Sequence, residues 1–230
     1  MNLFDNTLRD GGNVVGHGFS LELTTSIIEG LLAAGIRDIE LGNCKGLGAY
    51  DQLGADKAPS DEEYFQLLQP YLSRGRIGMF LLSKCAKAEK IQKAAEAGLS
   101  FLRVGANAGD GESSVAAVKM VKAAGLTCRY SLMKAYVSTP AELADEAKML
   151  QAAGVDKITI MASAGTMFPA EAAAYTKALK VSLSIPVGFH GHSNLGLSQA
   201  NALAAVAAGA DEIDCGLLGM ARSAGSCATE

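Results

Sequence analysis

The segment GFHGHSN, residues 188–194, holds two of the three histidines of the chain, separated by a single glycine. In a β-strand the side chains alternate between two faces, so His190 and His192 would point to the same side. Two neighbouring imidazoles make a poor core but a good pair of ligands for a divalent metal ion. The segment therefore predicts a metal site, and a hydrogen-bonded pair of histidines at a loop is the alternative.

Several alanine-rich segments end in a glycine, and they indicate the repeating elements that position His190 and His192. After each such glycine comes a β-branched or apolar stretch, which is typical of a helix that ends at a glycine and is followed by a strand. The glycines are separated by about 30 residues or about twice that, the length of one or two strand–helix units. They are Gly35, Gly98, Gly125, Gly154 and Gly209.

The same pattern predicts eight strands that alternate with helices, near residues 2–7, 37–42, 76–82, 100–105, 127–133, 156–161, 185–190 and 211–215. Eight such units in 230 residues predict an α/β fold of the (β/α)8 TIM-barrel class, with residues 1–230 forming a single catalytic domain. A doubly wound open sheet is the alternative, but no GxGxxG motif follows the first strand.

The end of the sequence predicts an incomplete outer layer of helices. The chain stops after SAGSCATE, where an eighth outer helix would begin, so we expect that helix to be missing. Its absence would expose an apolar strip on the eighth and first strands, which a second copy of the chain could cover. We therefore expect a homo-oligomer or a longer natural chain.

A third metal ligand follows from the barrel geometry, because the carboxyl ends of the strands build the site in such barrels. The first strand ends in TLRDGG, which supplies Arg9 and Asp10, and only the eighth strand separates it from the seventh. Asp10, His190 and His192 would then form a set of one carboxylate and two imidazoles with open positions for substrate. This set suits Mn²⁺, Co²⁺, Zn²⁺, Fe²⁺ or Mg²⁺, and the residues do not choose among them. Our expectation for the cofactor is Mn²⁺, with Mg²⁺, Co²⁺ or Zn²⁺ as alternatives.

Three further strand ends supply candidates for substrate binding. Glu40 ends the second strand and Arg103 lies on the fourth, where the two could instead simply pair with each other. Lys134 follows the fifth strand and is also a candidate for a Schiff base, the main rival to metal chemistry. A salt-bridge partner at the barrel mouth is the alternative for Lys134.

The long loop GNCKGLGAYDQLGADKAP after the second strand is a candidate binding loop. Lys45, Tyr50 and Lys57 could contact an anionic substrate there, and a solvated loop is the alternative for each. Cys44 is a candidate ligand or nucleophile, although no histidine is tied to it by spacing.

Composition excludes several classes of partner and compartment. The net charge of -4 is scattered along the chain, so we expect neither nucleic acid nor a membrane surface as a partner. Five cysteines without a CxxC pair indicate free thiols in a reducing cytosol. Because no signal peptide and no long apolar run is present, we expect a cytoplasmic protein.

Four segments together resemble the DRE-TIM metallolyases, barrels of the HMG-CoA lyase type, and are most similar to the 4-hydroxy-2-oxovalerate aldolases of that superfamily. The resemblance covers essentially the whole chain and implies a metal-dependent barrel that cleaves 4-hydroxy-2-oxo acids to pyruvate and an aldehyde. It implies that Asp10, His190 and His192 hold the metal and that Arg9 binds the keto or enolate oxygen. The segments are DNTLRDGG (5–12), IRDIELGNCKGLG (36–48), GFHGHSNLGLSQANALAAVAAGADEID (188–214) and GLLGMARSAG (216–225).

The chain departs from this family at the general base and at its end. Asn13 stands where the family has a histidine that is thought to act as base, so His17, on the same loop between two glycines, becomes the candidate catalytic base. The alternative is an exposed His17 with a metal-bound hydroxide as base. The family's C-terminal extension, which packs on a partner aldehyde dehydrogenase, is absent, so we do not expect that partner.

Two other functions remain open beside the aldolase acting on a small 2-oxo acid. One is a Claisen-type, acyl-transferring synthase of the same superfamily, although such synthases usually carry further domains. The other is a binding or regulatory barrel with weak or no catalysis, which the asparagine at position 13 and the missing helix would favour.

Overall fold

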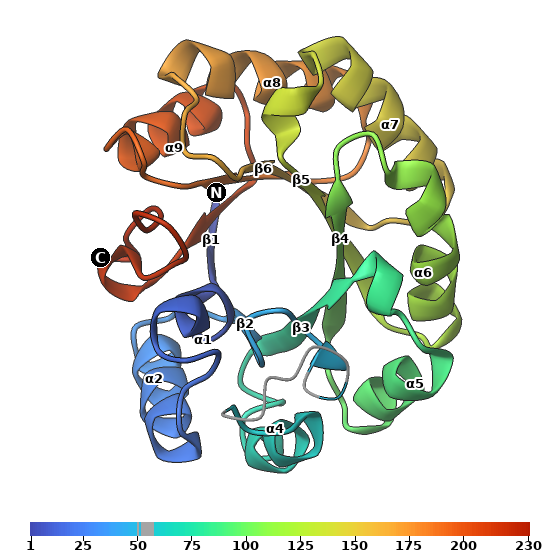
Figure 1. The fold of residues 1–230 in the computed structure, drawn as a ribbon, viewed down its shortest axis with the longest axis vertical. Helices are drawn as coiled ribbons and strands as arrows, with labels where there is room; N and C mark the ends of the chain where they lie inside the picture. The colour runs from blue at the N-terminus through green and yellow to red at the C-terminus, as the bar shows by residue number, and fades with distance from the viewer. Residues whose placement is uncertain (50, 52–57) are drawn as a thin grey trace.

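The computed structural model describes residues 1–49, 51 and 58–230. Its eight parallel strands pair in sequence order from β1 to β8, and β8 pairs with β1, so the sheet closes into a barrel (Figure 1). This confirms the predicted (β/α)8 class and is incompatible with an open sheet. The strands are β1 Asn2–Asp5, β2 Asp38–Leu41, β3 Arg76–Leu82, β4 Phe101–Asn107, β5 Thr127–Met133, β6 Lys157–Ala162, β7 Val187–Gly191 and β8 Glu212–Cys215.

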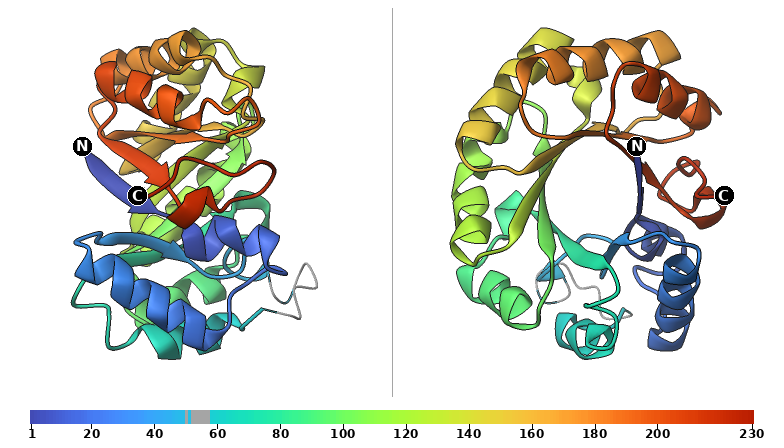
Figure 2. Two further views of the ribbon diagram at one scale, coloured as in Figure 1. Left: turned by 90° about the vertical axis from the view of Figure 1, so that its left-hand side faces the viewer. Right: turned by 180° about the vertical axis from the view of Figure 1, so that it is seen from behind.

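An outer ring of helices surrounds the strands (Figures 1 and 2). The predicted glycines end these helices in the left-handed conformation; Gly35 and Gly154, for example, have φ of 85° and 110°. The ring consists of α2 Leu21–Ala33, α4 Asp61–Leu68, α5 Ala88–Glu96, α6 Gly111–Ala123, α7 Pro140–Ala152, α8 Pro169–Ser182 and α9 Ser198–Ala207. Short helical turns occur in the loops, at α1 Thr7–Asp10 and, as 3₁₀ turns, at Gly11–Val14, Ser83–Cys85, Ala135–Val137 and Leu217–Gly219.

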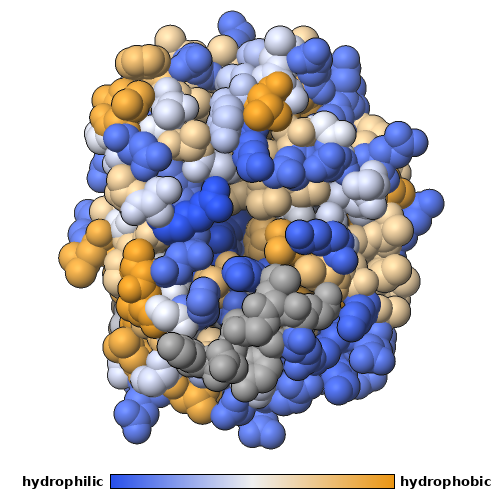
Figure 3. All heavy atoms as spheres, in the orientation of Figure 1, coloured by the Kyte–Doolittle hydropathy of each residue, from blue (hydrophilic) through white to orange (hydrophobic). Residues whose placement is uncertain are grey.

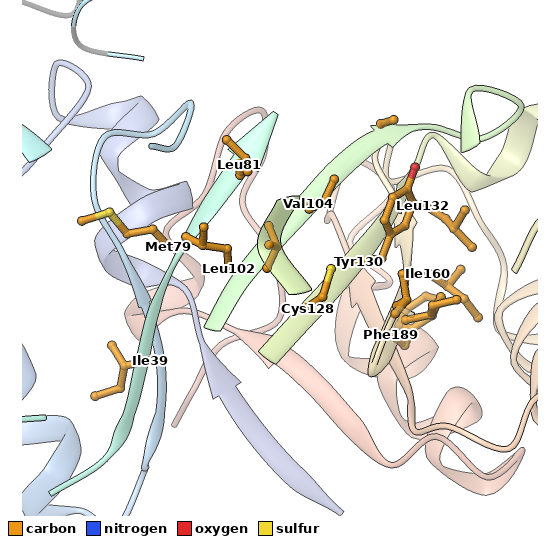
Figure 4. Packing of buried hydrophobic residues seen from close by; sticks show 14 of the residues in the cluster. Ile39, Met79, Leu81, Leu102, Val104, Cys128, Tyr130, Leu132, Ile160 and Phe189 are labelled. Atoms are coloured by element: carbon orange, nitrogen blue, oxygen red, sulfur yellow. The ribbon is translucent and has the colours of Figure 1, made fainter. Parts of the chain in front are cut away.

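The apolar core lies between the strands and the helices. Alternate residues of each strand contribute to it, as the period of two in a strand requires. Figure 4 shows part of this layer, in which side chains such as Met79, Leu102, Tyr130 and Phe189 pack together. In the described residues, no helix combines the length and the apolar character that are needed to cross a membrane.

The other residues of the same strands fill the barrel interior, and many of them are charged. Arg103 of β4 forms ion pairs with Glu40 of β2 and Asp214 of β8, and Arg129 of β5 pairs with Asp38 of β2 and Glu212 of β8. None of these pairs joins adjacent strands, so each crosses the inside of the barrel. Buried charges persist only when they are paired in this way.

The seam between β8 and β1 is covered by the chain itself. After β8, the described residues form one 3₁₀ turn and no α-helix. Instead, Gly216 N–H donates to the Cys227 carbonyl at 3.0 Å, and Thr229 Oγ1 donates to Asp5 Oδ2 at 2.7 Å. An apolar groove of about 630 Å³ remains beside β1, lined by Leu3, Ile27, Leu31, Ile36 and Leu217 among others. Association of copies through this strip stays a prediction.

Candidate active site

A cavity of about 250 Å³ opens at the carboxyl ends of the strands. Figure 3 views this face, where hydrophilic side chains surround a hollow near the middle of the molecule. Every strand end except that of β8 itself lies close to the cavity wall, and the segment after β8 also reaches it. The lining residues are Arg9, Asp10, Asn13, Cys44, Lys45, Phe80, Leu82, Asn107, Met133, Lys134, Met161, Ser163, His192 and Arg222.

The structure brings the three predicted metal ligands together. Asp10 belongs to the helical turn after β1, His190 lies on β7, and His192 follows that strand directly. Asp10 Oδ2 lies 3.5 Å from His190 Nε2 and 3.7 Å from His192 Nε2. One ligand atom from each residue lies within 4.8 Å of the other two, and all three side chains are buried.

Hydrogen bonds orient each candidate ligand so that one atom stays free. Arg9 Nη1 lies 3.1 Å from Asp10 Oδ1, and Asn13 Nδ2 donates to the same oxygen at 3.1 Å. Both donors therefore occupy Oδ1, and Oδ2 is left buried without a hydrogen-bond partner. Likewise, His192 Nδ1 lies 3.2 Å from the Arg222 carbonyl oxygen, which can only accept, so its Nε2 faces Asp10.

The free atoms fit a divalent cation. Buried polar atoms nearly always have a partner, yet Asp10 Oδ2 and His190 Nε2 have none. Ligand atoms about 2.0–2.2 Å from one ion lie about 3–3.5 Å from each other, which is close to the observed separations. Burial, and then the neighbouring His190, lower the pKa of His192 to about 4, so this imidazole is neutral and able to coordinate. Burial alone would raise the pKa of Asp10, but Arg9 and the histidines hold it below its ordinary value.

A chain of buried charges runs beneath the cavity and connects the ligands to Arg9. Asp214 Oδ2 lies 3.0 Å from His190 Nδ1 and accepts from Arg103 Nη1 at 2.5 Å. Arg103 donates from Nε and Nη2 to the two oxygens of Glu40 at 2.6 Å each, and Glu40 Oε1 also accepts from Arg9 Nε at 2.6 Å. Because Arg9 touches Asp10, the chain forms a ring that returns to the metal ligands. We call this set the charge ring; it consists of His190, Asp214, Arg103, Glu40, Arg9 and Asp10.

The sequence predicted that Glu40 and Arg103 bind substrate, and the structure corrects this. Both are buried to 1% exposure or less, neither lines the cavity, and they pair with each other, as the alternative interpretation held. Although burial disfavours its charge, Asp214 and Glu40 raise the pKa of Arg103 above its ordinary value. Glu40 and Arg103 therefore hold Arg9 and Asp214 in place beneath the cavity and do not contact a ligand inside it.

Arg9 is the member of the ring that reaches the cavity. Glu40 and Asp10 hold its Nε and Nη1, whereas its Nη2 is buried and has no hydrogen-bond partner. The ring of Phe80 lies 5.0 Å from the guanidinium carbon and packs against its face. Arg9 thus presents one fixed, unpaired donor at the wall of the cavity.

His17 lies away from the cavity wall in this structure. Its side chain is exposed, its φ is 81°, and it is absent from the lining. The backbone explains this position, because His17 N–H donates to the Gly12 carbonyl at 2.8 Å and its carbonyl accepts from Cys44 N–H at 3.1 Å. His17 is thus an exposed loop residue, as the alternative interpretation held. This position does not support direct action of His17 as a base.

The remaining candidates fall into three groups. Lys45 and Lys134 line the cavity, with Lys134 exposed at its mouth. Cys44 also lines it, but burial raises the pKa of its thiol, which disfavours a thiolate nucleophile or ligand. Tyr50 and Lys57 lie outside the described residues.

Sequence reasoning missed three polar residues of the wall. Asn107 ends β4, Ser163 follows β6, and Arg222 lies in the segment after β8. The first two stand at strand ends, where the rule that found Glu40 and Arg103 could have found them. Arg222 lies within GLLGMARSAG, whose basic residue was the available signal.

A closed parallel barrel with an Asp–His–His cluster at its carboxyl rim defines a TIM-barrel protein with a candidate metal centre. A family model described as HMGL-like matches residues 1–230, so the chain belongs to the HMGL-like family, which confirms the resemblance to the DRE-TIM metallolyases.

Relatives with assigned names agree with this family. The chain is 35% identical over 228 residues to a 4-hydroxy-2-oxovalerate aldolase from Carboxydothermus hydrogenoformans, covering 99% of this chain and 68% of that protein. It is 37% identical over 229 residues to the enzyme of the same name from Roseiflexus sp., with coverage of 99% and 68%. The chain thus spans about two thirds of the length of these relatives.

Solved structures support the fold. The N-terminal domain of a putative aldolase from Bacteroides vulgatus superposes with a TM-score of 0.80 at 23% identity, covering 100% of this chain and 77% of that one. The carboxyl transferase domain of Rhizobium etli pyruvate carboxylase, solved with pyruvate and biocytin, gives 0.82 at 20% identity, with coverage of 99% and 42%.

Proposed function

We propose that this protein is a divalent-metal-dependent aldolase that cleaves, or in reverse forms, a carbon–carbon bond in a 4-hydroxy-2-oxo acid, giving pyruvate and an aldehyde. One observation carries the proposal: Asp10, at the cavity wall, keeps a free Oδ2 that lies 3.5 Å from the free Nε2 of His190, and it contacts Arg9, which lines the same cavity and whose Nη2 also lacks a partner. The names of the relatives support the same reaction class.

The metal ligands and Arg9 have different roles in the proposed reaction. Bound by Asp10, His190 and His192, a divalent ion, with Mn²⁺ as first choice, would supply Lewis-acid polarisation of the 2-oxo acid. Arg9 offers its free Nη2 to the keto oxygen, which becomes negative as the bond breaks. Because Glu40 and Asp10 already fix the guanidinium, this donor needs no reorganisation when charge develops.

Cleavage needs one proton transfer at each end of the broken bond. A base removes the proton of the 4-hydroxyl, the C3–C4 bond breaks, and its electron pair enters the enolate of pyruvate. Protonation at C3 then gives pyruvate, while C4 leaves as the aldehyde carbonyl. The apolar side chains of Phe80, Leu82 and Met161 line the cavity and limit access of water to the enolate.

The size of the cavity favours the aldolase over the synthase. About 250 Å³ is small beside the 300–1,000 Å³ of sites for drug-sized ligands. A short 2-oxo acid matches this space, whereas most of an acyl thioester would extend beyond the described wall. We place the activity in the cytoplasm, in keeping with the five free cysteines.

Release of pyruvate from a panel of 4-hydroxy-2-oxo acids, with and without added Mn²⁺, tests the proposal. We expect release that depends on the metal and is lost with a chelator. Metal binding without turnover would indicate a binding barrel, and condensation of a 2-oxo acid with an acyl thioester would indicate the synthase. Borohydride trapping of pyruvate on Lys134 would show Schiff-base chemistry and would overturn the metal mechanism.

A further inference from the structure

The polar residues of the cavity form two walls. Because the strands close in sequence order, the ends of β4 and β5 lie across the barrel from the ends of β8 and β1, and the end of β6 lies between β5 and β7 (Figure 1). The metal-side wall contains Arg9, Asp10, His192 and Arg222, and the far wall contains Asn107, Lys134 and Ser163. Proposed metal chemistry uses only the metal-side wall, so the far wall needs a separate explanation.

The far wall is built by contacts between strands. Lys134 N–H donates to Ser163 Oγ at 2.9 Å, which joins the ends of β5 and β6. Ala108 N–H donates to the Met133 carbonyl at 2.7 Å, which joins the ends of β4 and β5. Lys134 itself has a left-handed backbone, with φ of 54°, a conformation that is uncommon for non-glycine residues.

The charge of Lys134 is not balanced within the described part of the chain. Ion pairs at the cavity join Arg9 to Asp10 and Glu40, and the two histidines to Asp10, but none includes Lys134. Two more cations without a described ion pair, Lys45 and Arg222, line the same space, whereas Asp10 is its one described carboxylate. Such a cavity attracts a ligand with more than one negative charge.

We propose that the substrate carries a second carboxylate at the end distant from its 2-oxo acid group, and that Lys134 on the far wall binds it. The inference rests on the proposed function and specifies its substrate class: a 4-hydroxy-2-oxo dicarboxylic acid. Cleavage then gives pyruvate and an aldehyde that itself bears a carboxylate. The carboxyl and keto groups lie at the metal-side wall, and the chain between them and the distal carboxylate crosses Phe80, Met133 and Met161.

Binding of stable analogues tests this without requiring turnover. 2-Oxoheptanedioate and 2-oxoheptanoate have the same carbon chain, but only the first has a distal carboxylate. With the Mn²⁺-loaded protein in calorimetry, we expect the dioate to bind about 5-fold more tightly, the upper end for an ion pair of an exposed side chain. Lys134→Gln should remove most of this ratio, and Lys119→Gln, on the exposed face of α6, should keep it.

Equal binding of the two analogues, or an unchanged ratio in Lys134→Gln, would overturn the inference. Turnover separates it from the proposed function. Condensation of pyruvate with succinic semialdehyde and with butanal should favour the first, carboxylated aldehyde. A preference for the dioate without condensation would support the distal carboxylate site at Lys134 and reject the aldolase. Equal condensation of both aldehydes would support the aldolase and reject the distal carboxylate site.

Discussion

Asp214 Oδ2 lies 3.0 Å from Nδ1 of His190, and both side chains are fully buried. Asn6 Nδ2 also lies 3.2 Å from this nitrogen, but the carboxylate of Asp214 is closer and charged and can only accept, which favours the tautomer with the proton on Nδ1. The lone pair of His190 is thereby directed through Nε2 toward Asp10. Contacts of this kind behind a metal ligand fix the tautomer and the orientation of the ring.

Replacing Asp214 should therefore weaken metal binding. Asp214→Asn keeps the volume but removes the charge that holds the Nδ1 proton, and we expect the affinity for Mn²⁺ to fall about 10- to 100-fold. Titration of the folded variant with Mn²⁺ measures this. Asp145→Asn, an exposed residue of α7, is the control. An unchanged dissociation constant would show that Asp214 does not orient His190.

Removing a ligand should abolish the metal and spare the barrel. His190→Ala deletes the Nε2 donor, while Arg103 still balances the charge of Asp214. We expect no stoichiometric metal by elemental analysis and an unchanged circular dichroism spectrum. The exposed His17→Ala serves as the control that retains metal. Full metal content in His190→Ala would disprove the ligand set.

Arg9→Lys should retain the metal and lose most activity. Lysine cannot form the planar set of contacts to Glu40 and Asp10 and also present a free donor to the substrate. Loss of one such donor typically lowers kcat about 10²–10³-fold. Steady-state kinetics with a matched Arg37→Lys control, at an exposed position, measures it. A kcat equal to that of the control would remove Arg9 from the mechanism.

The exposed position of His17 leads to an expectation for its own variant. His17→Ala should keep a kcat close to that of the unaltered protein and the same acidic limb of the pH–rate profile, because the side chain does not line the cavity. The opposite result is equally informative. A fall of about 10²–10⁴-fold, with loss of that limb, would identify His17 as the base and imply that its loop moves during catalysis.

The charge ring should also matter for stability. Arg103→Met would leave Glu40 and Asp214 buried without their main partner, which typically costs about 3–5 kcal/mol. Denaturant unfolding of the metal-free protein should show this loss in the free energy of unfolding. Lys119→Met, at an exposed position of α6, should change little. A loss no larger than that of the control would mean that the barrel tolerates unpaired carboxylates in its interior.

The sequence predicted the strands, and the meeting of Asp10, His190 and His192 at one place, because both follow from simple rules. Helix-ending glycines locate each strand–helix unit, and strand ends in such a barrel share one rim. Asp10 and the two histidines were therefore predicted to meet, although they lie far apart in the chain. The two candidates Glu40 and Arg103 were assigned to the correct strands.

The sequence did not predict how deeply a side chain lies in the barrel, or where an irregular loop places its side chains. A strand position indicates which face a side chain takes, but whether it reaches the cavity or stays beneath it depends on its partners across the barrel. Glu40 and Arg103 stay below because each satisfies the other. His17 is directed outward by two backbone hydrogen bonds of a loop without periodicity. Arg222 likewise belongs to an irregular segment, where no repeating pattern places a side chain.

The parallel pairing of β8 with β1 brings the two ends of the described chain side by side. One candidate ligand, Asp10, belongs to the helical turn after the first strand, whereas His190 lies on the seventh strand and His192 follows it directly. A bound ion would therefore link early and late segments of the polypeptide across the place where the barrel closes. Because such an ion binds only the closed form, it would oppose opening of the barrel there, by about 2.7 kcal/mol at a concentration 100 times its dissociation constant. During synthesis, the first turn would stay without its coordinating partners until the seventh strand had been made.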